Sequence, residues 1–391
     1  MLLTMPRIPR ELITRLNTAG FDAYAVGGAV RDTLLGRTPD DWDITTNATP
    51  AQTAQTFADC HCILTGAKHG TVTVVYDGMP IEITTYRVDG TYADNRHPNR
   101  VSFTSSLQED LLRRDFTVNT LVWHPDTGIL DYTDGMQDLK MRTLRCVGDP
   151  QTRFREDALR ILRALRFAAT YGFHIEPVTA DAIHKTAHLL RNVAIERIYA
   201  ELTRLLCGEH VATVLSDFAD VLTVIFPHLA SMPSDLPQKI ADAPQDTACK
   251  LACLLSPVPH LATDILHALK TDTHTKERTK RFLQYLVTPF PTENIRYFLK
   301  TVLRECGEAD TRLCLALCKA DTATLDTLIA ENACYKIADL TVNGNDIAAL
   351  GFCGADIGNV LEYLLQAVMR ETCGNTSQAL LTLAKTYKSN P

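Results

Sequence analysis

The hydrophobic pattern of the chain changes its period once, and this change most constrains the fold. Up to about residue 145, apolar residues alternate in short runs such as AYAVGG, GTVTVVY, PIEITTYR and FTVNTLVWH, which are typical of strands. From about Arg153 onward they recur at helical spacing. In ALRILRALRFAATY, five apolar residues share one helix face: Ala158, Ile161, Leu162, Leu165 and Ala168. The pattern predicts an α+β chain, with a small mixed α/β head followed by an all-helical remainder.

Composition supports a folded protein and limits its class. The chain has 391 residues, of which 46% are hydrophobic and 22% charged, enough for sizeable apolar cores. No apolar run approaches the roughly 20 residues of a membrane span, and the N-terminal sequence lacks a signal-peptide pattern. The net charge of −7 argues against a general nucleic-acid coat, but not against a local basic site. We therefore expect a cytoplasmic protein without membrane contact.

The twelve cysteines do not predict disulfides or a zinc site. They include no CxxC pair, and no histidines stand at zinc-finger spacing. We expect reduced, mostly buried thiols.

The segment AYAVGGAVRDTLLGRTPDDWDITT predicts a site for phosphate and metal. A strand runs into Gly27-Gly28, which lets a ligand approach the backbone, and a helix with free N–H groups follows at once. Asp41 and Asp43 are one residue apart, so on a strand both carboxylates point to one side, an arrangement that suits Mg²⁺ and bridging phosphates. Each feature alone is common, as a turn or as solvated surface. Together they predict nucleotidyl transfer.

This combination resembles the DNA polymerase beta nucleotidyltransferase superfamily, in which a later strand usually supplies a third carboxylate. Glu82 is the candidate, because its two isoleucine neighbours on the strand would face the core while Glu82 faces the other way. Asp115 is the alternative, but it stands at the start of a predicted helix, where capping is the ordinary role. Metal ions held by Asp41 and Asp43 would bridge the triphosphate and a primer 3′-hydroxyl and neutralise charge on departing pyrophosphate.

A second segment, GDPQTRFREDALRILRALRFAATYGF, predicts base selection. Asp157 and Arg160 are three residues apart on a predicted helix, so their side chains should be neighbours. Asp157 can accept from an exocyclic amine and Arg160 can donate to a ring nitrogen, which matches cytosine and adenine but not uracil or guanine. A mismatch leaves polar groups unpaired at about 1–3 kcal/mol each, so the pair could select CTP and ATP without a template. Glu156 could brace Arg160.

The commoner use of such a pair is a surface ion pair, but the local charge favours a binding site. Residues 140–167 hold eight Lys or Arg against three Asp or Glu, in a chain that is acidic overall. A basic patch of this kind is typical of surfaces that meet phosphates.

Together with GGAVRD, DDWDI, KHGTVTV, DGTYADNRHP and LLRRDFTVN, this segment makes the chain resemble the class II tRNA nucleotidyltransferases, the bacterial and eukaryotic CCA-adding enzymes. The resemblance extends to LTVNGNDIAALGFCGADIGNVLEYLL near the end. It implies template-independent addition of CCA to the 3′ end of tRNA from CTP and ATP, with Mg²⁺ as cofactor and release of pyrophosphate. It also implies nucleotide binding at the matching positions: Gly28, Arg31, Arg114, Asp157, Arg160, Arg163 and Arg166.

The segment from Arg87 to Pro98 predicts a polar loop that contains Asp89, Asp94 and Arg96. In the family that the chain resembles, this loop helps the site switch from CTP to ATP, and enzymes that add only the two cytidines lack it. Its presence favours complete CCA addition over a CC-adding or an A-adding enzyme. An ordinary hairpin loop is the alternative interpretation.

Three parts are expected: a DNA polymerase beta-like catalytic head over residues 1–145, a base-selecting helical neck over 146–206, and a helical body and tail that bind tRNA over 207–391. A poly(A) polymerase shares head and neck but typically has a basic C-terminal extension, whereas residues 231–391 hold 16 Lys or Arg and 18 Asp or Glu. A phosphohydrolase is rejected because no His-Asp dipeptide stands in the region around LACLLSPVPH, where relatives with that activity carry one. An inactive RNA-binding scaffold is disfavoured because the aspartates and arginines are intact. The sequence does not predict the oligomeric state.

Overall fold

The structure is a computed structural model, and it describes residues 5–89, 101–229, 232–288, 291 and 293–387. Asp94 and Arg96 of the predicted loop therefore lie outside the described residues. The chain forms two compact units, Met1–Ala241 with Ala268–Lys270 and Asp242–His267 with Thr271–Pro391. Within the described ranges, no helix combines the length and the apolar character needed to cross a membrane.

The first unit contains one seven-stranded sheet. Its strands are β1 (Ala23–Val26), β2 (Asp43–Thr46), β3 (His61–Ile63), β4 (Thr71–Tyr76), β5 (Met79–Thr85), β8 (Val122–His124) and β9 (Gly128–Leu130). They lie in the order β3-β4-β5-β2-β1-β8-β9. Two small sheets pair β6 (Arg87–Asp89) with β7 (Val101–Phe103) and β10 (Thr143–Leu144) with β11 (His174–Ile175). Three of the four quoted runs are strands as predicted, but FTVN mostly forms the short helix η2 (Thr117–Asn119).

The register of the central strands determines what meets at the end of the sheet. β2 pairs antiparallel with β1, which places Asp43 opposite Val26, and parallel with β5, which places Asp43 opposite Glu82. Gly27 and Gly28 follow Val26 directly. Glu82 is exposed while its two isoleucine neighbours are buried, as predicted. The Gly-Gly turn and two of the three predicted carboxylates therefore lie at one place on the sheet.

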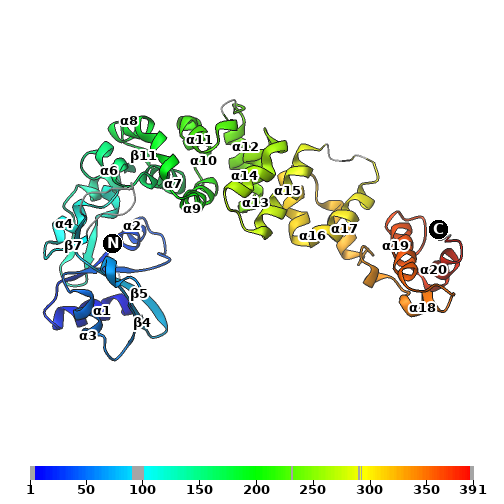
Figure 1. Cartoon of the computed structure of the whole chain (residues 1–391), viewed down its shortest axis with the longest axis horizontal. Helices are drawn as coiled ribbons and strands as arrows, with labels where there is room; N and C mark the ends of the chain where they lie inside the picture. Colours follow the sequence, from blue (N-terminus) through cyan, green and yellow to red (C-terminus); the bar gives the residue numbers. More distant parts are fainter. Residues whose placement is uncertain (1–4, 90–100, 230–231, 289–290, 292, 388–391) are drawn as a thin grey trace. The chain divides into compact units, whose positions relative to one another are not determined.

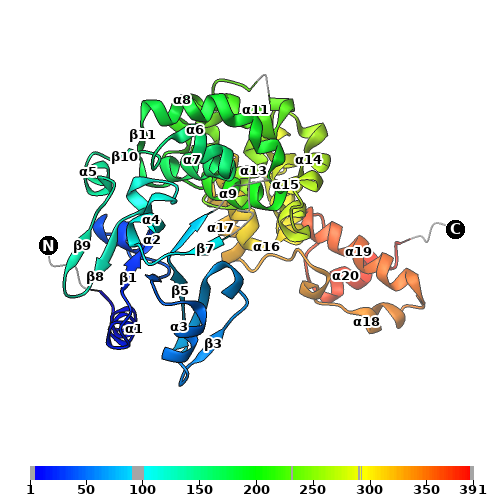
Figure 2. The same ribbon diagram turned by 60° about the vertical axis from the view of Figure 1, so that its left-hand side comes forward.

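Among the described residues of this region, the α-helices beside the sheet are α1 (Arg7–Thr18), α2 (Gly28–Leu34), α3 (Pro50–Thr56), α4 (Leu107–Leu112) and α5 (Gly135–Lys140). α1 and α3 contact each other and the strands β1, β2, β4 and β5 (Figure 2). Gly27, just before α2, has a φ of 75°, a left-handed conformation that favours glycine. This turn lets the chain pass from β1 into α2 without an intervening loop.

The rest of the first unit is mostly helical, as the change of period predicts. Its helices are α6 (Pro150–Glu156), α7 (Leu159–Tyr171), α8 (Pro177–Thr186), α9 (Ile195–Leu206), α10 (Val211–Asp217), α11 (Ala219–Ile225) and α12 (Leu236–Asp242). All five residues of the predicted apolar face are buried. α7, which contains Arg160, packs along α9.

One expectation about this region is wrong: Asp157 and Arg160 do not share a helix. α6 ends at Glu156, Asp157 has an extended backbone (φ −140°, ψ 102°), and α7 begins at Leu159. The Asp157 carboxylate accepts from the backbone N–H of Leu159 at 3.1 Å. Such a side-chain bond to nearby backbone competes with helical hydrogen bonding and accounts for the break.

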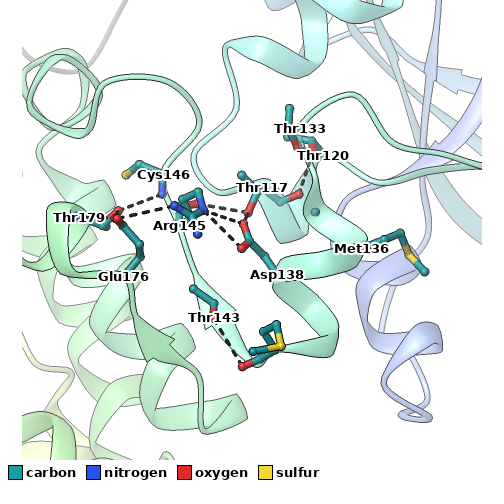
Figure 3. A network of polar contacts seen from close by, with 12 residues as sticks. Thr117, Thr120, Thr133, Met136, Asp138, Thr143, Arg145, Cys146, Glu176 and Thr179 are labelled. Carbon is teal, nitrogen blue, oxygen red and sulfur yellow. Dashed lines mark hydrogen bonds and ion pairs between the residues drawn. The ribbon is translucent and has the colours of Figure 1, made fainter.

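A polar network ties the sheet region to the helices that follow it (Figure 3). Arg145 donates from Nε to Asp138 Oδ2 at 3.1 Å, and its Nη1 lies 3.6 Å from Glu176 Oε1. Asp138 also accepts from Thr117 Oγ1 at 2.7 Å. The network therefore links η2, α5 and the chain just before α8 through one arginine.

The second unit is helical (Figure 1). It has its own apolar clusters. Its helices are α13 (Thr247–Leu255), α14 (Ala262–Ala268, which crosses the unit boundary), α15 (Thr273–Val287), α16 (Ile295–Leu317), α17 (Ala323–Ala330), α18 (Gly344–Ala348), α19 (Ala355–Met369) and α20 (Ser377–Ala384). Leu299 and Leu325 belong to a cluster between α16 and α17, and Val360 and Leu380 to one between α19 and α20.

All twelve cysteines lie in the described residues, and none forms a disulfide. Five are buried, six are half-buried and Cys353 is exposed. The expectation of free thiols is confirmed, but the expectation that most are buried is not, since several lie at the margins of helices.

Candidate active site

A cavity of about 490 Å³ brings together the Gly-Gly turn, the start of β2 and the first turns of α7. Every predicted site residue except Glu82 lines it: Gly28, Arg31, Asp41, Asp43, Arg114, Asp157, Arg160, Arg163 and Arg166. The wall also includes residues outside that predicted set: Gly27, Arg113, Asp115, Asn119, Leu159, Phe167 and Arg197. Residues that are far apart in the sequence thus face one space.

Asp41 and Asp43 both face this cavity, although not from one strand as predicted. β2 begins at Asp43, and Asp41 lies in the exposed chain just before it. Burial, followed by the nearby carboxylates of Asp41 and Glu82, raises the pKa of Asp43 to about 6. Crowded carboxylates of this kind are stabilised by a cation, so the donor set fits a divalent metal ion.

Glu82 lines a second, smaller cavity of about 220 Å³. Asp43, Arg113 and Arg114 line both cavities. Asp43 therefore stands between the two spaces, with Asp41 on one side and Glu82 on the other.

Among the described residues, no group of three or more His, Cys, Asp or Glu side chains forms a ready-made metal site. This is compatible with an ion such as Mg²⁺, which is usually bound by one or two carboxylates and takes its remaining ligands from waters and substrate phosphates.

A buried carboxylate holds the two arginines shared by the cavities. Asp110 is fully buried and accepts from Arg113 Nη2 at 2.6 Å and from Arg114 Nη2 at 3.1 Å. Burial opposes ionisation of Asp110, but the guanidiniums of Arg114 and Arg113 outweigh it and lower its pKa. Arg114 Nε is buried and has no hydrogen-bond partner within the described residues. The other nitrogens of this guanidinium remain partly exposed, since the Arg114 side chain is 20% exposed.

Arg31 is less available than the resemblance implies. It is buried, and it donates to Asn119 Oδ1 and to the hydroxyl of Tyr171, both at 2.6 Å. Its guanidinium also lies over the Tyr171 ring at 4.4 Å from the centroid. These contacts make Arg31 a brace between α2 and α7 at the cavity wall.

Arg163 and Arg166 are each paired with a carboxylate. Arg163 Nη2 lies 2.6 Å from Asp115 Oδ2, and Arg166 Nε lies 2.5 Å from Glu201 Oε2. Burial works against ionisation of Asp115, but Arg163 and a hydrogen bond from Asn119 lower its pKa. The capping role expected for Asp115 is therefore wrong, because this residue is a buried ion-pair partner.

Asp157 and Arg160 face the same cavity but are each held by a different partner. Arg160 donates to Glu156 Oε2 at 2.8 Å and to the Arg113 carbonyl at 3.0 Å, so the expected brace by Glu156 is present. Asp157 Oδ2 accepts from Arg197 Nη2 at 2.9 Å. The two predicted base-selecting groups are thus positioned independently.

Sequence reasoning missed Asp110, Asn119, Tyr171, Arg197 and Glu201. Arg197 and Glu201 are four apart on α9, so they share a helix face. That spacing alone does not indicate a site. It becomes informative only once α9 is known to pack against α7.

Comparisons with known proteins bear on this arrangement. Residues 23–145 match the family described as the poly A polymerase head domain, and residues 172–232 match a probable RNA and SrmB-binding site of polymerase A. The chain is 34% identical over 386 residues to the CCA-adding enzyme of Pediococcus pentosaceus, which covers 95% of this chain and 96% of that relative.

Solved structures are also similar. The crystal structure of the Bacillus stearothermophilus CCA-adding enzyme in complex with CTP has a TM-score of 0.84 and 31% identity, over 98% of both chains. The Thermotoga maritima CCA-adding enzyme complexed with tRNA has a TM-score of 0.71 over 98% of this chain and 96% of that one. At 20% identity, this second likeness concerns the fold alone.

Proposed function

The chain belongs to the family of CCA-adding enzymes, and we propose that it adds C, C and A in turn to the 3′ end of tRNA, using CTP and ATP and releasing pyrophosphate. The observation that carries our assignment of residues is the single cavity that joins the carboxylates at the start of β2 to Asp157 and Arg160. One space can then hold both the triphosphate and the base of an incoming nucleotide.

Nucleotidyltransferases of this kind use a divalent metal ion, and we propose Mg²⁺ held by Asp41 and Asp43. When bound, the ion supplies charge neutralisation and lowers the pKa of a primer hydroxyl. The like-charge crowding around Asp43 supports this assignment. Asp43 also faces the smaller cavity with Glu82, so we assign that cavity to the 3′ end of the tRNA.

The arginines of the wall would hold the triphosphate. Arg114 is well placed for this, because it lines both cavities while Asp110 fixes its Nη2. Asp157 and Arg160 would accept from and donate to the Watson–Crick edge of cytosine or adenine. We keep the predicted division into a catalytic head over 1–145, a neck over 146–206 and a tRNA-binding body and tail over 207–391, in a cytoplasmic protein.

An incorporation assay tests this function. With tRNA that lacks its CCA end and all four nucleotides, we expect two cytidines and one adenosine, and with tRNA ending in CC and ATP alone, a single adenosine. A long adenosine tail would indicate a poly(A) polymerase, and arrest after two cytidines would indicate a CC-adding enzyme.

The Asp43→Ala variant tests the metal assignment. We expect incorporation to be lost while tRNA binding is retained, because the metal ligand is removed and the helical body is untouched. Unchanged incorporation would remove Asp43 from the site.

A further inference from the structure

Arg197 holds both carboxylate oxygens of Asp157. Arg197 Nη2 lies 2.9 Å from Oδ2, and Arg197 Nη1 lies 3.4 Å from Oδ1. The backbone N–H of Leu159 donates to the same Oδ1 at 3.1 Å. The Arg197 and Asp157 side chains are 26% and 18% exposed, so the pair is partly shielded from water.

These contacts leave little acceptor capacity on Asp157. An ionised carboxylate offers about four acceptor positions. The Arg197 fork and the Leu159 N–H occupy three of them, so about one is left for a ligand in the cavity. A donor that meets this position must come from the direction that Arg197 leaves open.

We propose that Arg197 is a positioning residue that fixes the last acceptor of Asp157, and that it thereby sets the discrimination of CTP and ATP against UTP and GTP. The inference rests on the proposed function, in which Asp157 accepts from the exocyclic amine of the base. Arg197 acts through Asp157.

Arg197 matters for Asp157 in particular, because Arg160 is held in place by other residues. Arg160 is fixed by Glu156 and by the Arg113 carbonyl, whereas Asp157 depends on α9 and on one backbone N–H. Without Arg197, the Asp157 side chain is free to rotate or to pair with Arg160. Cytosine and adenine then lose an acceptor, and uracil and guanine no longer meet a fixed, repulsive oxygen.

The test compares nucleotide selectivity in full-length variants. Single-nucleotide incorporation is measured as kcat/KM, for CTP and UTP on tRNA lacking CCA and for ATP and GTP on tRNA ending in CC. For Arg197→Met we expect both selectivity ratios to fall at least tenfold, mainly through loss of CTP and ATP incorporation. Arg197→Lys, which keeps the charge but not the fork, should give intermediate ratios.

Arg145→Met is the matched control. Arg145 also bridges carboxylates in the first unit (Figure 3). It lines neither of the two cavities that Asp43 lines. Its selectivity ratios should equal those of the unsubstituted protein. A fall equal to that of Arg197→Met would mean that any loosening of the unit relaxes selectivity, and would overturn the proposal.

Asp157→Asn separates this inference from the proposed function. If Asp157→Asn lowers the ratios and a folded Arg197→Met does not, the role of Arg197 is wrong and base selection by Asp157 stands. If Asp157→Asn leaves the ratios unchanged, base selection by Asp157 fails and the role of Arg197 fails with it. Should Arg197→Met not fold, unchanged ratios in Arg197→Lys overturn the proposal.

Discussion

Asp43 is a carboxylate that the fold places among like charges. Its pKa is raised to about 6 by burial and then by its acidic neighbours, whereas an unfolded aspartate has a pKa of about 4. Between these values the folded state binds more protons than the unfolded state, so stability falls as pH rises from about 4 to about 6. Above pH 6 the loss of stability caused by the ionised Asp43 carboxylate persists in full, unless a bound cation offsets it.

We therefore expect Asp43→Asn to raise the unfolding free energy of the metal-free protein at pH 8 by about 1–3 kcal/mol, and by about a third of that amount at pH 4.5. Thermal unfolding in a chelator at the two pH values measures this difference. Asp126→Asn, which alters an exposed carboxylate, is the control and should show no such pH-dependent gain. A destabilised Asp43→Asn at pH 8 would contradict the argument.

Asp110 and Asp138 offer a matched pair of buried carboxylates. Both accept from arginine, but only the partners of Asp110 line the cavities. Removing Asp110 leaves two shielded guanidiniums without this anion, which typically costs about 3–5 kcal/mol. Arg145 is 47% exposed, so we expect a smaller loss of stability for Asp138→Asn.

Only Asp110→Asn should also raise the KM for nucleotides, by about tenfold, since a lost contact of about 1.4 kcal/mol has that effect. The increase should be alike for CTP and ATP, because Arg113 and Arg114 would contact phosphate and not the base. Steady-state kinetics on both variants measures it. An equal rise in KM for Asp138→Asn would show that the effect is merely structural.

At the scale of elements, the close packing beside α9 depends on Gly208. A Cβ at this position would lie 2.6 Å from the Ala169 Cβ on α7. The backbone N–H of His210 also donates to the Ala169 carbonyl at 2.8 Å, so the two segments cannot easily separate.

We expect Gly208→Ala to lower the unfolding free energy by about 1–3 kcal/mol, the usual cost of overpacking. Denaturant unfolding followed by circular dichroism measures it. Gly358→Ala in α19 is the control, because no other atom lies within 4 Å of the added carbon. That variant should be neutral or slightly stabilising.

Elements that depend on nearby residues were predictable from sequence. Apolar residues at every second position predicted β1, β4 and β5, and apolar residues at helical spacing predicted the buried face of α7. Each of these patterns depends on only a few neighbouring residues. The helix break at Asp157 was not predictable, since no glycine or proline marks it. The break depends on a side chain that bonds the backbone two residues on.

The site was predictable in its residues but not in its contacts. The motifs, together with the family resemblance, named nine of the residues that line the larger cavity. The partners of the arginines lie far along the chain: Asp115 is 48 residues from Arg163, Glu201 is 35 from Arg166, and Asp157 is 40 from Arg197. Such pairs arise from helix packing, which one sequence does not reveal.

At the scale of the molecule, the two compact units each have a core of their own. Both tryptophans, Trp42 and Trp123, belong to the first unit, where their rings lie 6.0 Å apart. Tryptophan fluorescence therefore reports on the first unit alone, whereas circular dichroism reports on both. We expect the two unfolding curves not to coincide. Coincident curves, with equal calorimetric and van't Hoff enthalpies, would show a single cooperative unit.

Around the larger cavity, most positive charges have an assigned negative neighbour. The pairs are Arg31 with Asp32, Arg160 with Glu156, Arg163 with Asp115, Arg166 with Glu201 and Arg197 with Asp157. Replacing one member leaves the charge of the other without a partner, whereas replacing both together leaves no unpaired charge. Related sequences should therefore change both members of such a pair together, and rarely one alone. In a combinatorial library at positions 166 and 201, most functional variants should carry matching substitutions at both positions, such as two opposite charges or two neutral residues.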